Sequence, residues 1–105
     1  FESPRNLWHF ILTFSPEYNH RPDYFFMGLA NQIAFVFCRD YQVYYGLDKD
    51  TDNPHIHFAV NAYSYHPDAE LLSDLKMEHI SHYILSELQR IFPNINVRLA
   101  YTKEA

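Results

Sequence analysis

Hydrophobic and polar positions in the first half of the chain follow two different periods. Residues 7–14 (LWHFILTF) are mostly aromatic and aliphatic and end at Ser15-Pro16, which is typical of a strand. A polar, proline-containing segment follows and ends at Asp23, a residue type that caps helices. Apolar side chains then recur at helical spacing up to about residue 39, namely Phe26, Leu29, Ala30, Ile33, Val36 and Phe37. The first half therefore predicts a strand followed by a helix.

The second half predicts two strands, a long helix and a last strand. Residues 41–48 and 55–62 both have strand composition, and the segment between them is rich in Asp and Asn, which predicts a turn. A helical pattern covers about 69–91 and ends at Pro93. The apolar stripe of this helix is Met77, Ile80, Ile84, Leu88 and Ile91. Residues 96–101 predict a short final strand.

The order strand, helix, strand, strand, helix, strand predicts an α+β fold. In the ferredoxin-like β-α-β-β-α-β arrangement, two helices cover one face of an antiparallel sheet. A chain of 105 residues has the length of one domain. Because the chain begins with Phe1, we expect residues 1–105 to be part of a longer protein. The fold alone does not specify an activity, since unrelated functions share it.

Composition narrows the class of protein. With 48% hydrophobic and 18% aromatic residues the chain can bury enough apolar area to fold, and it has no apolar run long enough to span a membrane. The single cysteine, Cys38, excludes an internal disulfide and a multi-cysteine zinc site, and we expect it to be buried. The net charge of −5 is opposite to that of most non-specific nucleic-acid binders.

The pleat of the 55–62 strand separates its side chains into two sets. Side chains alternate between the two faces of a strand, so Ile56 and Phe58 face the predicted helices while His55 and His57 face the other side. Two imidazoles about 7 Å apart along one strand are near enough to bind one metal ion after modest adjustment. The spacing alone is equally compatible with two solvated histidines at the surface of a strand.

The same alternation places further polar side chains on this open face. In the 41–48 strand, Val43, Tyr45 and Leu47 suit the core. Asp48 then lies beside the histidine pair, where it offers a carboxylate as a third ligand. The alternation predicts further open-face positions along the 41–48 and 55–62 strands and on the other two strands. They are His9, Thr13, Gln42, Tyr44, Gly46, Ala59, Asn61 and Arg98.

Other motifs carry weaker signals. The run Asp48, Asp50 and Asp52 resembles a calcium loop, but the glycine of the turn and the bidentate glutamate of that loop are missing. His79 and His82 lie three residues apart without the zinc-binding helix motif, which indicates surface histidines.

The segment 44–61 (YYGLDKDTDNPHIHFAVN) resembles the metal-site motif of plasmid mobilisation relaxases, nickases of the HUH endonuclease superfamily. In that family a proline and a His-hydrophobic-His lie on the central strand, followed by an asparagine, as in residues 54–57 and Asn61 here. An aspartate–threonine pair precedes them, as in Asp50-Thr51. Upstream, residues 9–17 (HFILTFSPE) resemble the family's first strand.

Two features depart from the family pattern. Asp48 stands where the family has a third histidine, and a carboxylate still suits Mg²⁺ or Mn²⁺. The family's nucleophilic tyrosine comes before the first strand, whereas no tyrosine precedes Tyr18, so we expect the nucleophile upstream of residue 1. Related initiators and transposases carry the tyrosine on a helix after the histidines, a position that only Tyr83 matches, although partial burial explains Tyr83 better.

The resemblance implies a cytoplasmic, metal-dependent relaxase core that nicks and transfers single-stranded DNA at a transfer origin. It implies a metal site at His55, His57 and Asp48, holding Mg²⁺ or Mn²⁺. Contacts to DNA or to the ligands are then expected from Asn61, Thr13, Arg98 and Tyr44. Accessory mobilisation proteins are candidate partners, and no membrane is involved. The alternatives are a rolling-circle replication initiator, a single-tyrosine transposase-like nuclease, and a non-catalytic ferredoxin-like dimerisation or binding module. Nucleotide hydrolases and transferases with a His-x-His-x-His strand are disfavoured, because position 59 is Ala and the motif is incomplete.

Overall fold

The computed structural model describes residues 7–49, 52–66, 71–93 and 95–104. Its elements follow the predicted order with one added 3₁₀ turn. They are β1 (Leu7–Phe14), η1 (Pro16–His20), α1 (Asp23–Cys38), β2 (Tyr41–Asp48), β3 (His55–Ser64), α2 (Asp74–Ile91) and β4 (Val97–Glu104). The predicted β-α-β-β-α-β order is therefore confirmed.

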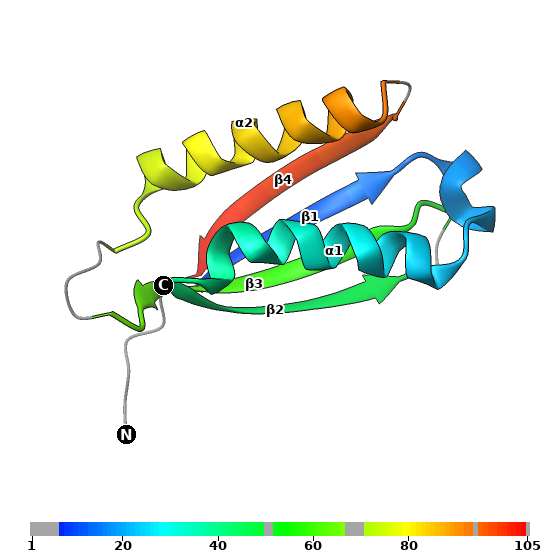
Figure 1. The fold of residues 1–105 in the computed structure, drawn as a ribbon. Coiled ribbons are helices and arrows are strands. Elements are labelled where there is room, and N and C mark those ends of the chain that lie inside the picture. Colours follow the sequence, from blue (N-terminus) through cyan, green and yellow to red (C-terminus); the bar gives the residue numbers. More distant parts are fainter. Residues whose placement is uncertain (1–6, 50–51, 67–70, 94, 105) are drawn as a thin grey trace.

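The strands of the described residues form one antiparallel sheet in the order β2-β3-β1-β4. Figure 1 shows α1 and α2 over the same face of this sheet. Both helices contribute buried side chains to one hydrophobic cluster with β1 and β3, which places the core between the helix layer and the sheet. This is the ferredoxin-like α+β fold that the element order predicts.

The core depends on the strict alternation of β1 and β3. In β1, Trp8, Phe10, Leu12 and Phe14 are all buried, while the residues between them are partly exposed. Phe10 pairs with Phe58 of β3 across the sheet, and their rings stack with centroids 4.4 Å apart. Aromatic rings in such contact add to the free energy gained by burying their area. The inward set predicted for β1 is confirmed.

The start of α1 differs from the prediction. Asp23 is the first helical residue and caps nothing; the N-cap position is Pro22, which forms no side-chain cap. The fixed φ of proline suits the start of a helix, and the Asp23 carboxylate lies 3.2 Å from Nζ of Lys49. The preceding polar segment also contains a 3₁₀ turn, whose bond from Tyr18 N–H to the Ser15 carbonyl the apolar pattern does not reveal.

The start of α2 lies further along the chain than predicted. The hydroxyl of Ser73 accepts a hydrogen bond from the Lys76 N–H and caps the helix at Asp74. Leu72 lies before the helix: its N–H donates to the Ala62 carbonyl and its carbonyl accepts from the indole of Trp8. These bonds fix the beginning of α2 against β3 and β1.

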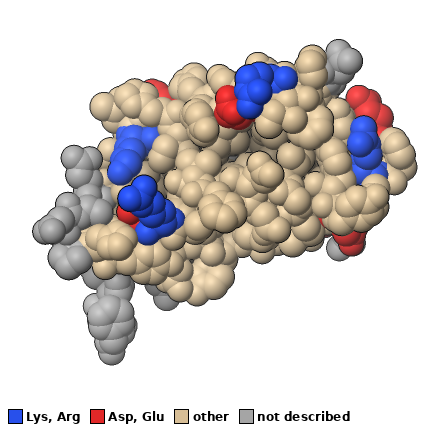
Figure 2. Space-filling model, viewed as in Figure 1, with Lys and Arg blue, Asp and Glu red and all other residues tan. Residues whose placement is uncertain are grey.

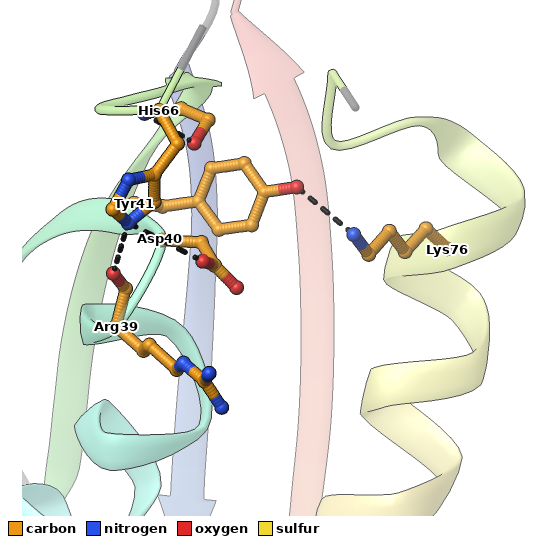
Figure 3. A network of polar contacts seen from close by, with 6 residues as sticks. Arg39, Asp40, Tyr41, His66 and Lys76 are labelled. Carbon is orange, nitrogen blue, oxygen red and sulfur yellow. Dashed lines mark hydrogen bonds and ion pairs between the residues drawn. The ribbon is translucent and has the colours of Figure 1, made fainter. Parts of the chain in front are cut away.

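A polar network at this end of the sheet links β2 to α2. The Nζ of Lys76 donates to the hydroxyl of the buried Tyr41 at 3.0 Å (Figure 3). On the other side of Tyr41, Nε2 of His66 lies 3.2 Å from the Arg39 carbonyl and 3.7 Å from the Asp40 carboxylate. The network therefore joins the turn before β2, the end of β3 and the first turn of α2.

Three further differences concern the edges of elements. β3 and β4 both extend beyond the predicted strands, β4 as far as Glu104. Cys38 is exposed, contrary to the expectation of a buried thiol. The helix turns by about 100° per residue, so the residue after the buried Phe37 points to solvent.

None of the described helices is long and apolar enough to cross a membrane.

We expect Phe10→Ala to lower the free energy of unfolding by about 3–5 kcal/mol, because it leaves a cavity at the centre of the core. Phe35→Ala is the matched control: this ring is 76% exposed, so its removal should change stability by less than about 0.5 kcal/mol. Urea unfolding followed by circular dichroism measures both. Equal losses for the two variants would contradict the core described above.

Candidate metal and nucleic-acid site

The face of the sheet away from the helices carries the two histidines that the sequence singles out. His55 and His57 both project from β3 on the side opposite to the buried Ile56 and Phe58. Their ring centroids are 5.8 Å apart and the ring planes differ by 26°. His55 is partly buried and His57 is exposed. The predicted juxtaposition of two imidazoles on the open face is present.

The register places a row of polar side chains across all four strands. His55 lies opposite Asp48 of β2 on one side and Thr13 of β1 on the other. Thr13 in turn lies opposite Arg98 of β4. Directly paired residues of an antiparallel sheet have Cβ atoms about 4.5–5.5 Å apart. The row Asp48–His55–Thr13–Arg98 therefore runs from one edge of the sheet to the other.

The row of His57 contains no other ionisable side chain on β2 or β1. His57 lies opposite Gly46 on one side and Ile11 on the other. A Cβ added to Gly46 would meet no atom within 4 Å. The surface beside His57 is therefore open, and a large group can approach its ring from the β2 side.

The separation of the two rings suits a shared ion. Two imidazoles that bind one ion through nitrogens at about 2.1 Å place their centroids roughly 5 Å apart. The observed 5.8 Å needs only a small rotation of the side chains to reach that value. Among the described residues, no group of three or more His, Cys, Asp or Glu side chains converges on one point as it stands. The pair thus fits two ligand positions, and Asp48 reaches a third only after turning toward them.

The Nδ1 atom of His55 is buried and has no hydrogen-bond partner among the described residues. A buried nitrogen without a partner carries a desolvation cost of about 1–3 kcal/mol. One of the two ring nitrogens of a neutral imidazole is always an acceptor, and a cation or a donor group would satisfy it. This orphaned atom is consistent with a ring placed for ligation.

Tyr44 and His9 lie one row further along the open face. Tyr44 of β2 and His9 of β1 both lie opposite Ala59 of β3. The Tyr44 ring is 63% exposed, and its hydroxyl accepts a hydrogen bond from the amide of Gln42. An exposed ring on an open sheet is a platform on which a base can stack.

Two candidate residues lie away from the histidine pair. Asn61 is four residues beyond His57 on β3, roughly 13 Å along the strand, and its side-chain oxygen accepts from the Tyr63 N–H. Tyr83 is on α2, where it lines a groove of about 110 Å³ between the helices. Because α2 covers the face of the sheet opposite to the histidines (Figure 1), the sheet separates Tyr83 from them.

Figure 2, a view from the helix side, shows an uncharged centre with charged groups around it.

The structure adds a polar pocket that sequence reasoning missed. It lies where β1 ends, next to the row that contains His55. Thr13 and Arg98 belong to the predicted open face, whereas Ser15, Asn53 and Asn96 come from loops. Loop positions follow no period, so the chain gives no signal that these three meet.

Several solved structures share the fold. The designed protein Foldit4 aligns with a TM-score of 0.53 at 16% identity, over 95% of this chain and 98% of that one. The designed protein Ferredog-Diesel aligns with a TM-score of 0.50 at 7% identity, over 95% and 89%. These two similarities extend to the ferredoxin-like fold alone. A putative PII-like signalling protein from Thermus thermophilus has a TM-score of 0.41 at 12% identity, over 95% and 87%.

The sequence itself identifies the family. Residues 2–91 match the relaxase family described as MobA/VirD2-like, nuclease domain. The chain therefore belongs to this family of DNA-nicking nucleases, which generally depend on a metal ion and bind single-stranded DNA. No curated protein matches the sequence at a significant level.

We expect Gly46→Ala to raise the free energy of unfolding by about 0.5–1 kcal/mol, because alanine loses less backbone entropy in a strand and its Cβ meets open space. Chemical denaturation measures the change. A destabilised variant would mean that another part of the protein covers the surface beside His57.

Proposed function

We propose that this chain is the core of a relaxase that nicks and transfers single-stranded DNA at the transfer origin of a plasmid or mobile element. The observation that carries the proposal is the histidine pair, with rings 5.8 Å apart, on the face of the sheet that the helices leave open. A nickase needs such a face, because a single strand must lie across the metal site with its bases accessible.

The proposed ligands of a divalent ion are His55 and His57, with Asp48 as the third. Asp48 lies opposite His55 in the register of β2 and β3, and its carboxylate favours Mg²⁺ or Mn²⁺ over softer ions. When bound, the ion supplies charge stabilisation to the oxygens of the scissile phosphate. The residues themselves orient that phosphate on the open face.

The proposed reaction is a transesterification. A tyrosine hydroxyl attacks phosphorus, the bond to the 3′ oxygen breaks, and that oxygen takes up a proton to become a free 3′ hydroxyl. The strand stays joined to the protein as a 5′-phosphotyrosine, which keeps the reaction reversible for strand transfer. We place the nucleophilic tyrosine upstream of residue 1, since Tyr83 lies on the helix side of the sheet.

Contacts with the strand are proposed for Tyr44 by stacking, and for Thr13, Arg98 and Asn61 through the backbone of the DNA. The net charge of −5 limits how much affinity this chain gains from phosphate neutralisation. We therefore propose that part of the basic DNA-binding surface lies outside residues 1–105 or on accessory mobilisation proteins. We propose a cytoplasmic location for the chain.

One observation favours a second function. No three ligating side chains of the described residues converge, which is also the arrangement expected of a binding module whose metal site has been lost. Metal titration separates the two functions.

We expect Mn²⁺ at about a hundred times its Kd to raise the melting temperature of the unaltered protein by roughly 10 °C, because an ion that binds only the folded state stabilises it. His57→Ala should abolish the increase, and Asp48→Asn should reduce it. Differential scanning fluorimetry with and without EDTA measures these shifts.

His79→Ala is the matched control, since this side chain is exposed on α2, on the helix side of the sheet (Figure 1), and the variant should keep the full increase. An unaltered protein that Mn²⁺ does not stabilise would refute the metal site and favour the binding module. An equal increase in His57→Ala would place the ion elsewhere.

A further inference from the structure

A second polar feature lies at the end of the open face. It is a pocket of about 300 Å³ where β1 passes into the loop before η1. Its lining residues are Thr13, Phe14, Ser15, Pro16, Asn53, Asn96 and Arg98. Pockets that bind small groups begin at about this size. The lining comes from three separate parts of the chain, which the fold brings together.

The chemistry of the lining selects for an anion. Arg98 supplies a guanidinium, Thr13 and Ser15 supply hydroxyls, and Asn96 supplies an amide. No carboxylate of the described residues lines the pocket, although the chain has 13 acidic residues against 8 basic ones. Arg98 is exposed and forms no hydrogen bond or ion pair with any described residue. By contrast, Lys49 and Arg90 are each paired with a carboxylate.

The hydroxyl of Ser15 gives an independent reason to expect a ligand. Its Oγ is buried and has no hydrogen-bond partner among the described residues. Although Ser15 stands before η1, its side chain caps no backbone N–H. A buried hydroxyl without a partner costs free energy, so its retention in a polar pocket is explained by a group that it contacts only in the bound state.

Hydrogen bonds to the backbone fix the walls of the pocket before any ligand arrives. The Ser15 N–H donates to the Asn96 carbonyl at 3.2 Å, which joins the two loops. The side-chain amide of Asn53 donates to the Phe14 carbonyl at 2.9 Å, and the Phe14 N–H donates to the Pro54 carbonyl at 2.9 Å. A preformed site loses less conformational entropy on binding.

We propose that this pocket binds a phosphate group of the nucleic-acid strand, next to the phosphate held at the histidines. The identification of the bound group as a phosphodiester rests on the proposed function. Thr13 lies between His55 and Arg98 in the register, so the backbone of Arg98 is two strand spacings, roughly 10 Å, from that of His55. A single strand of DNA that crosses the sheet at His55 therefore passes the pocket. A phosphate bound there would fix the position of the DNA relative to the bond that is cleaved.

The first test measures binding of a short fluorescein-labelled oligothymidine by anisotropy, in EDTA so that no cleavage occurs. We expect Arg98→Gln to weaken binding about tenfold at low salt, because it removes a charge-assisted contact. The slope of log affinity against log salt should fall by about one. Arg90→Gln is the matched control: it removes the same charge from α2, on the helix side, and should change neither quantity.

The second test uses Ser15→Ala. Loss of an unpartnered hydroxyl should leave the melting temperature unchanged or raise it, whereas oligothymidine should bind about threefold more weakly. A side chain with only a structural role would give the reverse result. Chemical-shift changes of the Thr13, Ser15 and Arg98 amides on adding inorganic phosphate distinguish capture of a free phosphate from capture of a strand.

The outcomes separate this inference from the nickase proposal. Weaker binding by Arg98→Gln supports the pocket even if Mn²⁺ fails to stabilise the protein. Equal binding by Arg98→Gln and Arg90→Gln overturns the pocket and leaves the histidine site unaffected. An unaltered protein that binds no oligothymidine also overturns it. If inorganic phosphate shifts these amide signals but Arg98→Gln does not change the affinity for oligothymidine, the pocket is overturned as a strand-binding site.

Discussion

The strict alternation of β3 between two environments is the constraint on which the rest of the structure depends. Ile56, Phe58 and Val60 pack under the helices, and this burial fixes the register of the strand. A slip of one residue would bury His55 and His57 and expose the aromatic core. The apolar half of β3 therefore holds the polar half in place. The hydrophobic free energy of folding also maintains the geometry of the open face.

Where tertiary packing and the local hydrophobic pattern agree, the sequence predicts the limits of an element almost to the residue. The limits of β1 and β2 match the sequence prediction, because their alternation is clear and turn residues flank them. The start of α2 does not match, because Ser73 caps the helix while Leu72 is held by the Trp8 indole, a contact 64 residues apart in the chain. Such long-range bonds leave no periodic signal.

The candidate functional site also has one part that the sequence predicts and one part that it does not. Which side chains share the open face is predictable from period two, and the register then pairs Asp48 with His55 as expected for a short hairpin. Whether these side chains converge on one ion is not predictable, since it depends on rotamers. The pocket with Ser15 and Asn96 lay outside any prediction, because the two loops that carry them meet through the backbone hydrogen bond from Ser15 to Asn96.

The outward position of Cys38 has a practical consequence. It is the sole thiol of the sequence and is exposed at the end of α1, a helix that covers the face of the sheet opposite to the histidines (Figure 1). A maleimide fluorophore attached there would sit on the helix layer. Energy transfer from it to a dye on either end of a bound oligonucleotide would then report the polarity with which the strand crosses the molecule.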